Sequence, residues 1–148
     1  MLSKATEYAI RALVYIDLQN KQGQTPGFRE ISREIDSPVQ FTAKILQTLT
    51  RYGLISSMKG RGGGFFFDDR AEELTLYEVV HAWEGNQFFN RCLFGFKYCD
   101  HEHPCPLHED FMKIWEDFKA LLKRETIQSM ARKIENQEAV LNKLSLND

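Results

Sequence analysis

The sequence "FTAKILQTLTRYGLISSMKGRGGGF", residues 41–65, decides the fold of this chain. Large apolar residues in its first half recur at the spacing of one helix face: Phe41, Ile45, Leu46 and Leu49. Gly53 is a typical helix stop, and the second half has the pattern of strand, Gly-rich turn and strand. The stretch therefore predicts a helix followed at once by a β-hairpin with the basic tip "KGRGGG".

Two more helices are expected before this stretch. Apolar residues keep a helical period over residues 3–19 and again over "FREISREI" at 28–35, with a polar Gly/Pro break between them. Ser37 is expected to cap the third helix, with Pro38 as its first residue and Gln40 completing a capping box. Three short helices followed by a basic hairpin are the order of a winged helix-turn-helix. The expected fold class is therefore mainly α with a small β-hairpin wing.

The third helix and the hairpin are the expected DNA-binding surface. The start of such a helix enters the major groove, and the solvent-facing set predicted there is Gln40, Thr42, Ala43 and Lys44. Glutamine can bond adenine at two points and lysine can reach guanine acceptors, so Gln40 and Lys44 are the candidates for base contacts. A capping box is a competing role for the Gln40 amide.

The basic residues of the hairpin are expected to contact phosphates or the minor groove, because a glycine tip lets the backbone approach DNA closely. These residues are Lys59 and Arg61, and the further candidates for phosphate contacts are Lys4, Arg11 and Arg51. For each single cation, a solvated surface charge is the competing interpretation. A nucleotide-binding loop is disfavoured, because "KGRGGG" lacks the order of either phosphate-binding fingerprint and precedes no helix.

Charge is divided unevenly along the chain. The net charge is −2, but residues 1–67 hold nine Lys/Arg against five Asp/Glu, while residues 68–148 hold ten against sixteen. A basic front and an acidic rear are typical of a chain whose N-terminal half binds a polyanion. Lys4, Glu7 and Arg11 interrupt the first apolar run, which excludes a signal peptide or membrane span there. We expect a soluble cytoplasmic protein.

All three cysteines fall within the loop "NRCLFGFKYCDHEHPCPLHED", residues 90–110. An odd number of thiols in a reducing compartment favours metal binding or redox work over a structural disulfide. Cys92, Cys99 and Cys105 have the spacing C-x6-C-x5-C, and His108 follows after two intervening residues. No C-x-x-C redox motif is present, and no short hook typical of structural zinc sites, so zinc is the less favoured metal. Thiolates are the usual ligands of iron–sulfur clusters.

Two helices are expected on either side of this loop. "TLYE" at 75–78 is a capping box that opens a fourth helix, which Gly85 closes. A long amphipathic helix begins at about Leu107. The tail from Ser129 onward keeps a weaker period, which fits either a frayed end or a second helix.

Several motifs together resemble the Rrf-type family of bacterial winged-helix transcriptional regulators. They are "LSKATEYAIRAL", the stretch at 41–65, "LTLYEVVHAWEG" and the three-cysteine loop, in that order. The resemblance covers roughly residues 1–130. It implies a homodimer, joined largely through the long C-terminal helix, that binds palindromic double-stranded operator DNA. It also implies an iron–sulfur cluster, [2Fe-2S] or [4Fe-4S], although one cysteine interval here is one residue longer than the common C-x5-C-x5-C.

The same resemblance leaves the fourth cluster ligand open. His108 stands where some relatives have a ligand histidine, three residues after the last cysteine. Glu7 occupies the place of an acidic ligand that the partner subunit donates in other relatives. His108 is slightly favoured. Each also has an ordinary alternative, a helix-start imidazole for His108 and a surface or dimer contact for Glu7.

The domain organisation follows from these assignments. Residues 1–70 are expected to form the winged helix-turn-helix domain, 71–89 the linking helix, 90–108 the cluster-binding cysteine loop, and 107–148 the dimerisation helix and tail. The expected function is a transcriptional regulator whose operator affinity depends on the cluster and so on redox state, nitric oxide or cluster status. A cluster-free thiol-based regulator is the alternative, and a thiol enzyme is a remote one because no paired base or substrate-binding motif accompanies the thiols.

Overall fold

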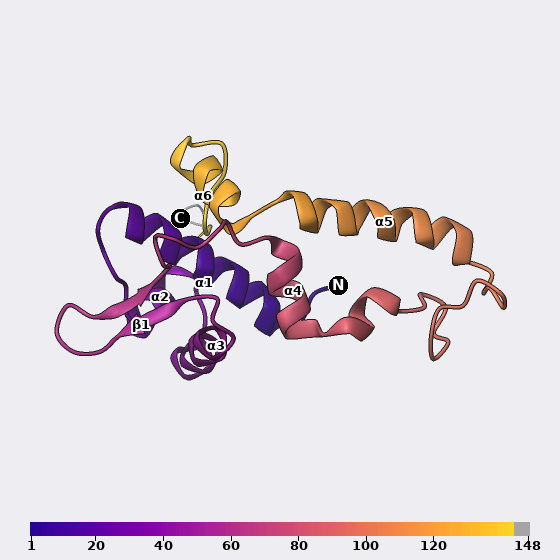
Figure 1. Cartoon of the computed structure of the whole chain (residues 1–148), viewed down its shortest axis with the longest axis horizontal. Helices are drawn as coiled ribbons and strands as arrows, with labels where there is room; N and C mark the ends of the chain where they lie inside the picture. The colour runs from indigo at the N-terminus through magenta and orange to yellow at the C-terminus, as the bar shows by residue number, and fades with distance from the viewer. Residues whose placement is uncertain (144–148) are drawn as a thin grey trace.

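The computed structural model describes residues 1–143, and Figure 1 shows the path of the chain. Its elements are α1 (Lys4–Lys21), α2 (Phe28–Glu34), α3 (Val39–Arg51), β1 (Ser56–Met58), β2 (Gly64–Phe66), α4 (Leu76–Glu84), the 3-10 helix η1 (Asn86–Asn90), α5 (His108–Arg124) and α6 (Ile127–Glu135). The two strands pair antiparallel, with Ser57 opposite Phe65. The prediction of a mainly helical fold with a β-hairpin wing is confirmed. Within residues 1–143, no helix is both long and apolar enough to cross a membrane.

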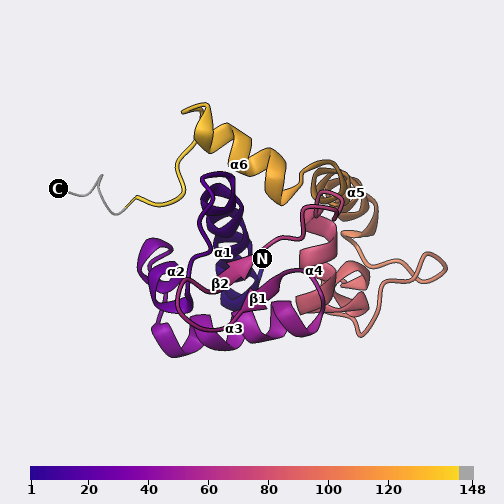
Figure 2. The ribbon, with the colours of Figure 1, turned by 60° about the vertical axis from the view of Figure 1, so that its left-hand side comes forward.

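Helix α1 is the centre of the N-terminal domain. In Figure 2, α3 runs along one side of α1 and α6 lies on the opposite side, with α2 and α4 at the ends of α3. Leu13 and Ile16 of α1 are fully buried, as are Ile31 of α2 and Leu46 and Leu49 of α3. The apolar faces of these helices therefore meet in one core, which fixes the angle of α3 relative to the rest of the domain.

The wing is anchored to the connection between α1 and α2. The Phe65 N–H donates to the Pro26 carbonyl over 2.9 Å, and the Phe67 N–H donates to the Asn20 side-chain oxygen over 2.9 Å. The Thr25 hydroxyl donates to the Gly62 carbonyl over 2.9 Å. One backbone bond and two side-chain bonds thus hold the hairpin against the 20–27 segment, while Lys59 and Arg61 at its tip stay exposed.

Helix α4 is fastened to the start of α1 by the carboxylate of Glu84. Its Oε1 accepts from the Ser3 N–H over 2.9 Å and from the Thr6 hydroxyl over 2.8 Å. A carboxylate at a helix N-terminus also meets the positive end of the helix dipole. Partial burial opposes ionisation, but these hydrogen bonds outweigh it and hold the pKa of Glu84 below its usual value. The last residue of α4 is therefore fixed to the N-terminal domain.

We expect Glu84 to make stability depend on acid pH. A folded-state pKa below the unfolded-state pKa means that this carboxylate stabilises the fold above its unfolded-state pKa, and that the contribution is lost as pH falls through the lowered folded-state pKa. The variant Glu84→Gln should be less stable than the wild type at neutral pH and should lose less stability on acidification. Urea unfolding at a series of pH values measures this. The matched control Glu138→Gln, at an exposed position after α6, should follow the wild type.

The long amphipathic helix and the tail after it form two helices, so the alternative of a second helix in the tail is confirmed. Helix α5 ends at Arg124, and α6 starts after a capping box in which Thr126 accepts from the Ser129 N–H over 2.8 Å. Thr126 pairs with Thr75, the cap of α4, in an isolated antiparallel bridge. The Leu76 N–H donates to the Glu125 carbonyl over 3.0 Å, and the Ile127 N–H donates to the Leu74 carbonyl over 2.8 Å. The chain turns back here because the backbone of 125–127 pairs with 74–76 instead of continuing the helix.

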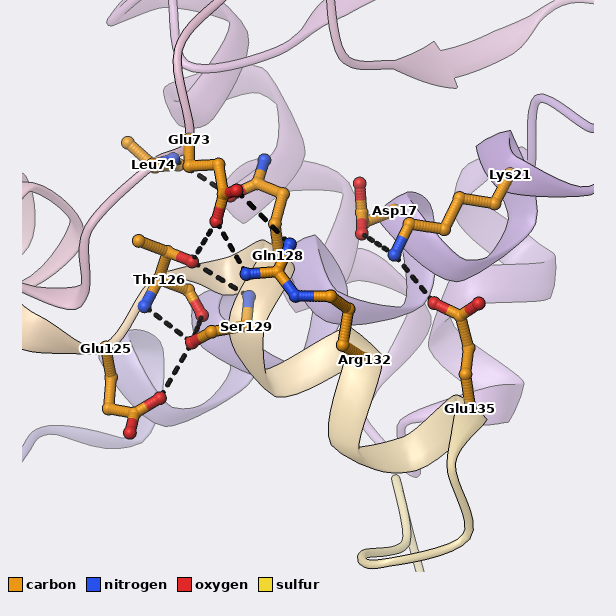
Figure 3. Close-up of polar contacts among 10 residues, drawn as sticks. All are labelled: Asp17, Lys21, Glu73, Leu74, Glu125, Thr126, Gln128, Ser129, Arg132 and Glu135. Carbon is orange, nitrogen blue, oxygen red and sulfur yellow. Dashed lines mark hydrogen bonds and ion pairs between the residues drawn. The ribbon is translucent and has the colours of Figure 1, made fainter.

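Helix α6 packs against α1 and belongs to the N-terminal domain in space. Ile127 and Ala131 are fully buried there. Figure 3 shows the polar contacts around them, including Arg132 to Glu73 at 3.0 Å and Lys21 to Glu135 at 2.6 Å. Such exposed ion pairs contribute about 0–1 kcal/mol each, so the two buried apolar side chains carry most of the packing. The predicted 107–148 dimerisation element is thus divided at Thr126, and residues 144–148 lie outside the described part.

Candidate DNA-binding surface and cysteine loop

The exposed face of α3 carries most of the residues predicted for base contact. Gln40 and Lys44 are exposed, and Ala43 is half-buried beside them. The capping box at Ser37 was a wrong prediction, because α3 begins at Val39 with Pro38 as its N-cap and no side chain caps it. The Gln40 amide is therefore not occupied by a capping bond.

Thr42 is the one predicted contact of this helix that the structure excludes from the surface. It is fully buried, and its hydroxyl donates to the Pro38 carbonyl over 2.9 Å and also bonds the Ser37 hydroxyl. Ser37 is held by α2 as well, since the Ser32 hydroxyl donates to its carbonyl over 2.6 Å. Ser37 and Thr42 thus form polar contacts between α2 and α3, which is why Ser37 does not cap α3 and Thr42 is not at the surface.

The wing tip presents Lys59 and Arg61 to solvent. Among the glycines beside them, Gly64 also has a role in the structure of the hairpin. A Cβ on Gly64 would lie 2.2 Å from the Thr25 carbonyl oxygen and 2.6 Å from that of Pro26. This glycine is therefore required by the anchoring of the wing.

The remaining predicted phosphate contacts lie around the helix ends and on α1. Lys4 is exposed and forms an ion pair with Glu7 at 3.1 Å. Arg51 is the last residue of α3, with its guanidinium 5.8 Å from the centre of the Tyr52 ring. Arg11 is half-buried, and its guanidinium lies 5.0 Å from the centre of the Tyr8 ring.

The cysteine loop connects η1 to α5 at the end of the molecule farthest from the wing (Figure 1). Cys105 is buried, and its carbonyl accepts from the His108 N–H over 3.1 Å at the start of α5. Cys92 and Cys99 are half-buried, and the Gly95 N–H closes a turn on the Cys92 carbonyl at 3.1 Å. The start of the loop is tied to α5 by the Trp115 indole N–H, which donates to the Phe89 carbonyl over 2.7 Å.

His108 lies directly beside Cys99. Its Nδ1 is 3.2 Å from the Cys99 sulfur, and its Nε2 is 2.9 Å from Nδ1 of His101. His108 is buried, with 6 % of its surface exposed, whereas His101 is exposed. The two imidazole rings also meet edge to face, with their centres 4.7 Å apart. The two histidines are seven residues apart across an irregular loop, so no periodic signal could have predicted that contact.

The Cys105 side chain influences the Cys92 thiol. Burial disfavours the Cys92 thiolate, but the backbone N–H groups of Phe96 and Phe94 and the Cys105 side chain together hold the pKa of Cys92 below its usual value. Burial, followed by the charges of Cys92 and Cys105, raises the pKa of the Cys99 thiol. The three sulfur atoms are therefore near enough to influence one another.

The four candidate ligands do not meet at one point. Among residues 1–143, no three His, Cys, Asp or Glu side chains are placed where they could all hold the same metal ion. The Cys99 sulfur contacts His108 at 3.2 Å, and the charges of Cys92 and Cys105 both act on the Cys99 thiol. Glu7 lies in the first turn of α1, where its carboxylate forms an ion pair with Lys4.

The N-terminal half has the architecture of a winged helix-turn-helix, the fold of a DNA-binding regulator. The chain belongs to the Rrf2 family, because the family model described as "Iron-dependent Transcriptional regulator" matches residues 2–133. This is a family of transcriptional regulators and not of enzymes.

Individual comparisons agree with this assignment. The chain is 33 % identical to the protein aau3 of Rhizobium meliloti over 133 residues, which are 88 % of this chain and 84 % of that protein. It is 25 % identical to the HTH-type transcriptional regulator IscR of Pectobacterium atrosepticum over 146 residues, which are 99 % of this chain and 82 % of that protein. The structure of CymR, the global cysteine regulator of B. subtilis, superimposes with a TM-score of 0.73 at 14 % identity, covering 89 % of this chain and 96 % of that one.

Proposed function

We propose that this regulator acts as a homodimer that binds double-stranded operator DNA through α3 and the wing, with an affinity set by an iron–sulfur cluster in the cysteine loop. The observation that carries the proposal is the gathering of every thiol of the chain, with His108, between η1 and the start of α5. The description of the family as iron-dependent supports it.

The pairing of the ligands favours an iron–sulfur cluster over zinc. A structural zinc ion takes four ligands in one tetrahedron. In a [2Fe-2S] cluster each iron takes two protein ligands, and histidine can replace cysteine. Cys99 with His108 is one such pair, which would have to open to admit an iron, and Cys92 with Cys105 would form the other. Glu7 of a partner subunit remains the alternative to His108.

The cluster would supply a centre that responds to electrons and to small oxidants. The chain's own residues connect this site to the DNA-binding domain at both of its ends. Cys92 follows η1 and α4, and α4 is bonded to the start of α1 through Glu84. His108 begins α5, and the 125–127 segment at its far end pairs with the start of α4. A change in the conformation of the loop would therefore shift both α4 and α5.

An exposed row of apolar residues on α5 supports dimerisation through this helix. Leu107, Ile114 and Leu121 are spaced seven residues apart and are exposed by 41 %, 61 % and 38 %. A seven-residue apolar repeat on an exposed helix face is typical of a helix-packing seam. Recognition helices in a dimer must lie about 34 Å apart to enter successive major grooves, so a change in the α5 packing would alter operator affinity.

A cluster-free thiol sensor is the second candidate, and the proximity of Cys92 to Cys105 favours it. Hydrogen peroxide could join the two sulfur atoms in a disulfide, with both thiol protons and two electrons passing to the peroxide to give water. This reaction needs no metal. It would constrain the same loop between η1 and α5.

Anaerobic purification separates the two candidates. We expect a coloured protein that contains iron and acid-labile sulfide, and whose operator affinity changes when the cluster is removed. Operator binding is measured by fluorescence anisotropy before and after removal. A colourless, iron-free protein that binds its operator and loses binding with peroxide would contradict the cluster and support the thiol sensor.

We expect Lys44→Ala to reduce sequence selectivity. Removing a base contact costs about 1–3 kcal/mol on the preferred operator and much less on unrelated DNA. Competition between the operator and a random duplex measures the ratio of affinities. The matched control Lys113→Ala, at an exposed position on α5, should leave the ratio unchanged. An unchanged ratio for Lys44→Ala would show that this lysine does not contact bases.

The double variant Lys59→Gln, Arg61→Gln should weaken binding to all sequences alike. Both side chains are exposed at the wing tip, and we expect them to contact phosphates. The slope of log affinity against log salt should fall by about one for each phosphate that the variant no longer neutralises. Titrations at several salt concentrations, on operator and random duplexes, measure this slope. A weakening confined to the operator would instead indicate base contacts by the wing.

A further inference from the structure

Val39 is a large apolar residue on the exposed face of α3, beside the polar Gln40 and Lys44. It is the first residue of the helix and is 39 % exposed. The core-facing side of the same two turns is closed by Thr42, Ile45 and Leu46, which are all buried. The side chain of Val39 therefore adds little to the core and extends the exposed face that begins the helix.

Val39 lies beside the two candidates for base contact. Residues four apart share a helix face, which places Ala43 below Val39 and Lys44 below Gln40. The exposed start of α3 thus has an apolar strip, Val39 and Ala43, parallel to a polar strip, Gln40 and Lys44. Ala43 is half-buried and has a single methyl group, so it leaves room in front of Val39.

The chemistry of the major groove identifies what such a strip can recognise. Base edges there present hydrogen-bond donors and acceptors, and one apolar group, the C5-methyl of thymine. Valine can neither donate nor accept, and placing it against an acceptor or donor edge would remove water without replacing its bonds. No side chain caps this end of α3, so no polar group of a cap stands in front of Val39.

We propose that Val39, with Ala43 beside it, packs against the C5-methyl group of a thymine in each operator half-site and selects thymine there. This inference rests on the proposed role of α3 in the major groove. The thymine is next to the base pair that Gln40 and Lys44 contact. Val39 is then a specificity residue that acts by apolar contact.

The test uses a duplex selected from a random pool by the full-length protein. Each thymine of the half-site is replaced in turn by deoxyuridine, which lacks only the methyl group. At one thymine per half-site we expect the wild type to lose about fourfold in affinity, which corresponds to one buried methyl group at about 0.8 kcal/mol. Val39→Ala should bind the unmodified duplex correspondingly less tightly and should not distinguish thymine from deoxyuridine at that position.

Two results would overturn the inference. One is that no thymine of the half-site is sensitive to removal of its methyl group. The other is that Val39→Ala loses as much affinity as the wild type when thymine is replaced by deoxyuridine. Thermal unfolding of Val39→Ala serves as the folding check, and little change is expected because the side chain is exposed. If Gln40→Ala with Lys44→Ala selects the same sequence as the wild type, the role of α3 itself fails, which is a different result from a failure of Val39 alone.

Discussion

The variant Cys105→Ser is expected to purify without iron or sulfide and without visible absorption. Cys105 is the most buried of the three thiols, and it lies at the start of α5 beside Cys92. A serine hydroxyl is a hard oxygen ligand that is seldom deprotonated at neutral pH, whereas these clusters are held by soft thiolates. The measurement is iron and sulfide content per chain with the visible spectrum, all under anaerobic conditions.

The matched control is His103→Ala in the same loop. The His103 side chain is 82 % exposed and bonds Asp100 across the turn, so its removal should leave the iron content unchanged. Iron retained at the wild-type level in Cys105→Ser would contradict the cluster site, and zinc in place of iron in the wild type would contradict its metal. His108→Ala and Glu7→Ala then distinguish the two candidates for the fourth ligand, because the true ligand should alter the spectrum and the iron content.

The helices and the wing could be predicted because their signals are local. The apolar period of α3 and the Gly-rich turn at 59–64 each describe a few consecutive residues, and the structure contains both elements. The start of α3 was predicted one residue too early, because it depends on contacts with another helix and not on a local signal alone. Ser37 satisfies every local rule for a cap, but its hydroxyl bonds Thr42 and its carbonyl bonds Ser32 of α2. Contacts between two helices thus override a local capping preference.

The end of α5 depended on a contact that the sequence does not reveal. Thr126 and Ser129 form a capping box, but the helix stops there because 125–127 pairs with 74–76, about 50 residues earlier in the chain. The cysteine loop is similar. The spacing of the thiols predicted that they lie together, whereas the contact of Cys99 with His108 depends on how the irregular loop folds.

Gly64→Ala is expected to displace the wing and to lower both stability and DNA affinity. The new Cβ would lie 2.2 Å from the Thr25 carbonyl oxygen, so the hairpin must move away from the 20–27 segment. The bond from the Phe65 N–H to the Pro26 carbonyl, 2.9 Å long, would then break. Overpacking of this kind costs about 1–3 kcal/mol, and more where backbone must shift. Urea unfolding measures the stability, and salt titrations measure the affinity for a random duplex.

The expected decrease in affinity depends on the two cations at the tip of the anchored hairpin, Lys59 and Arg61. If Lys59 and Arg61 contact phosphates only when the hairpin is held at its base, Gly64→Ala should reproduce the weaker binding and the smaller salt slope of the Lys59→Gln, Arg61→Gln variant, although both cations are still present. Gly27→Ala is the matched control, because a Cβ there has nothing within 4 Å and the residue adjoins the same anchor. Full affinity and an unchanged salt slope in Gly64→Ala would mean that the wing contacts DNA without its anchor, since the clash with Thr25 leaves the hairpin no way to keep its present place.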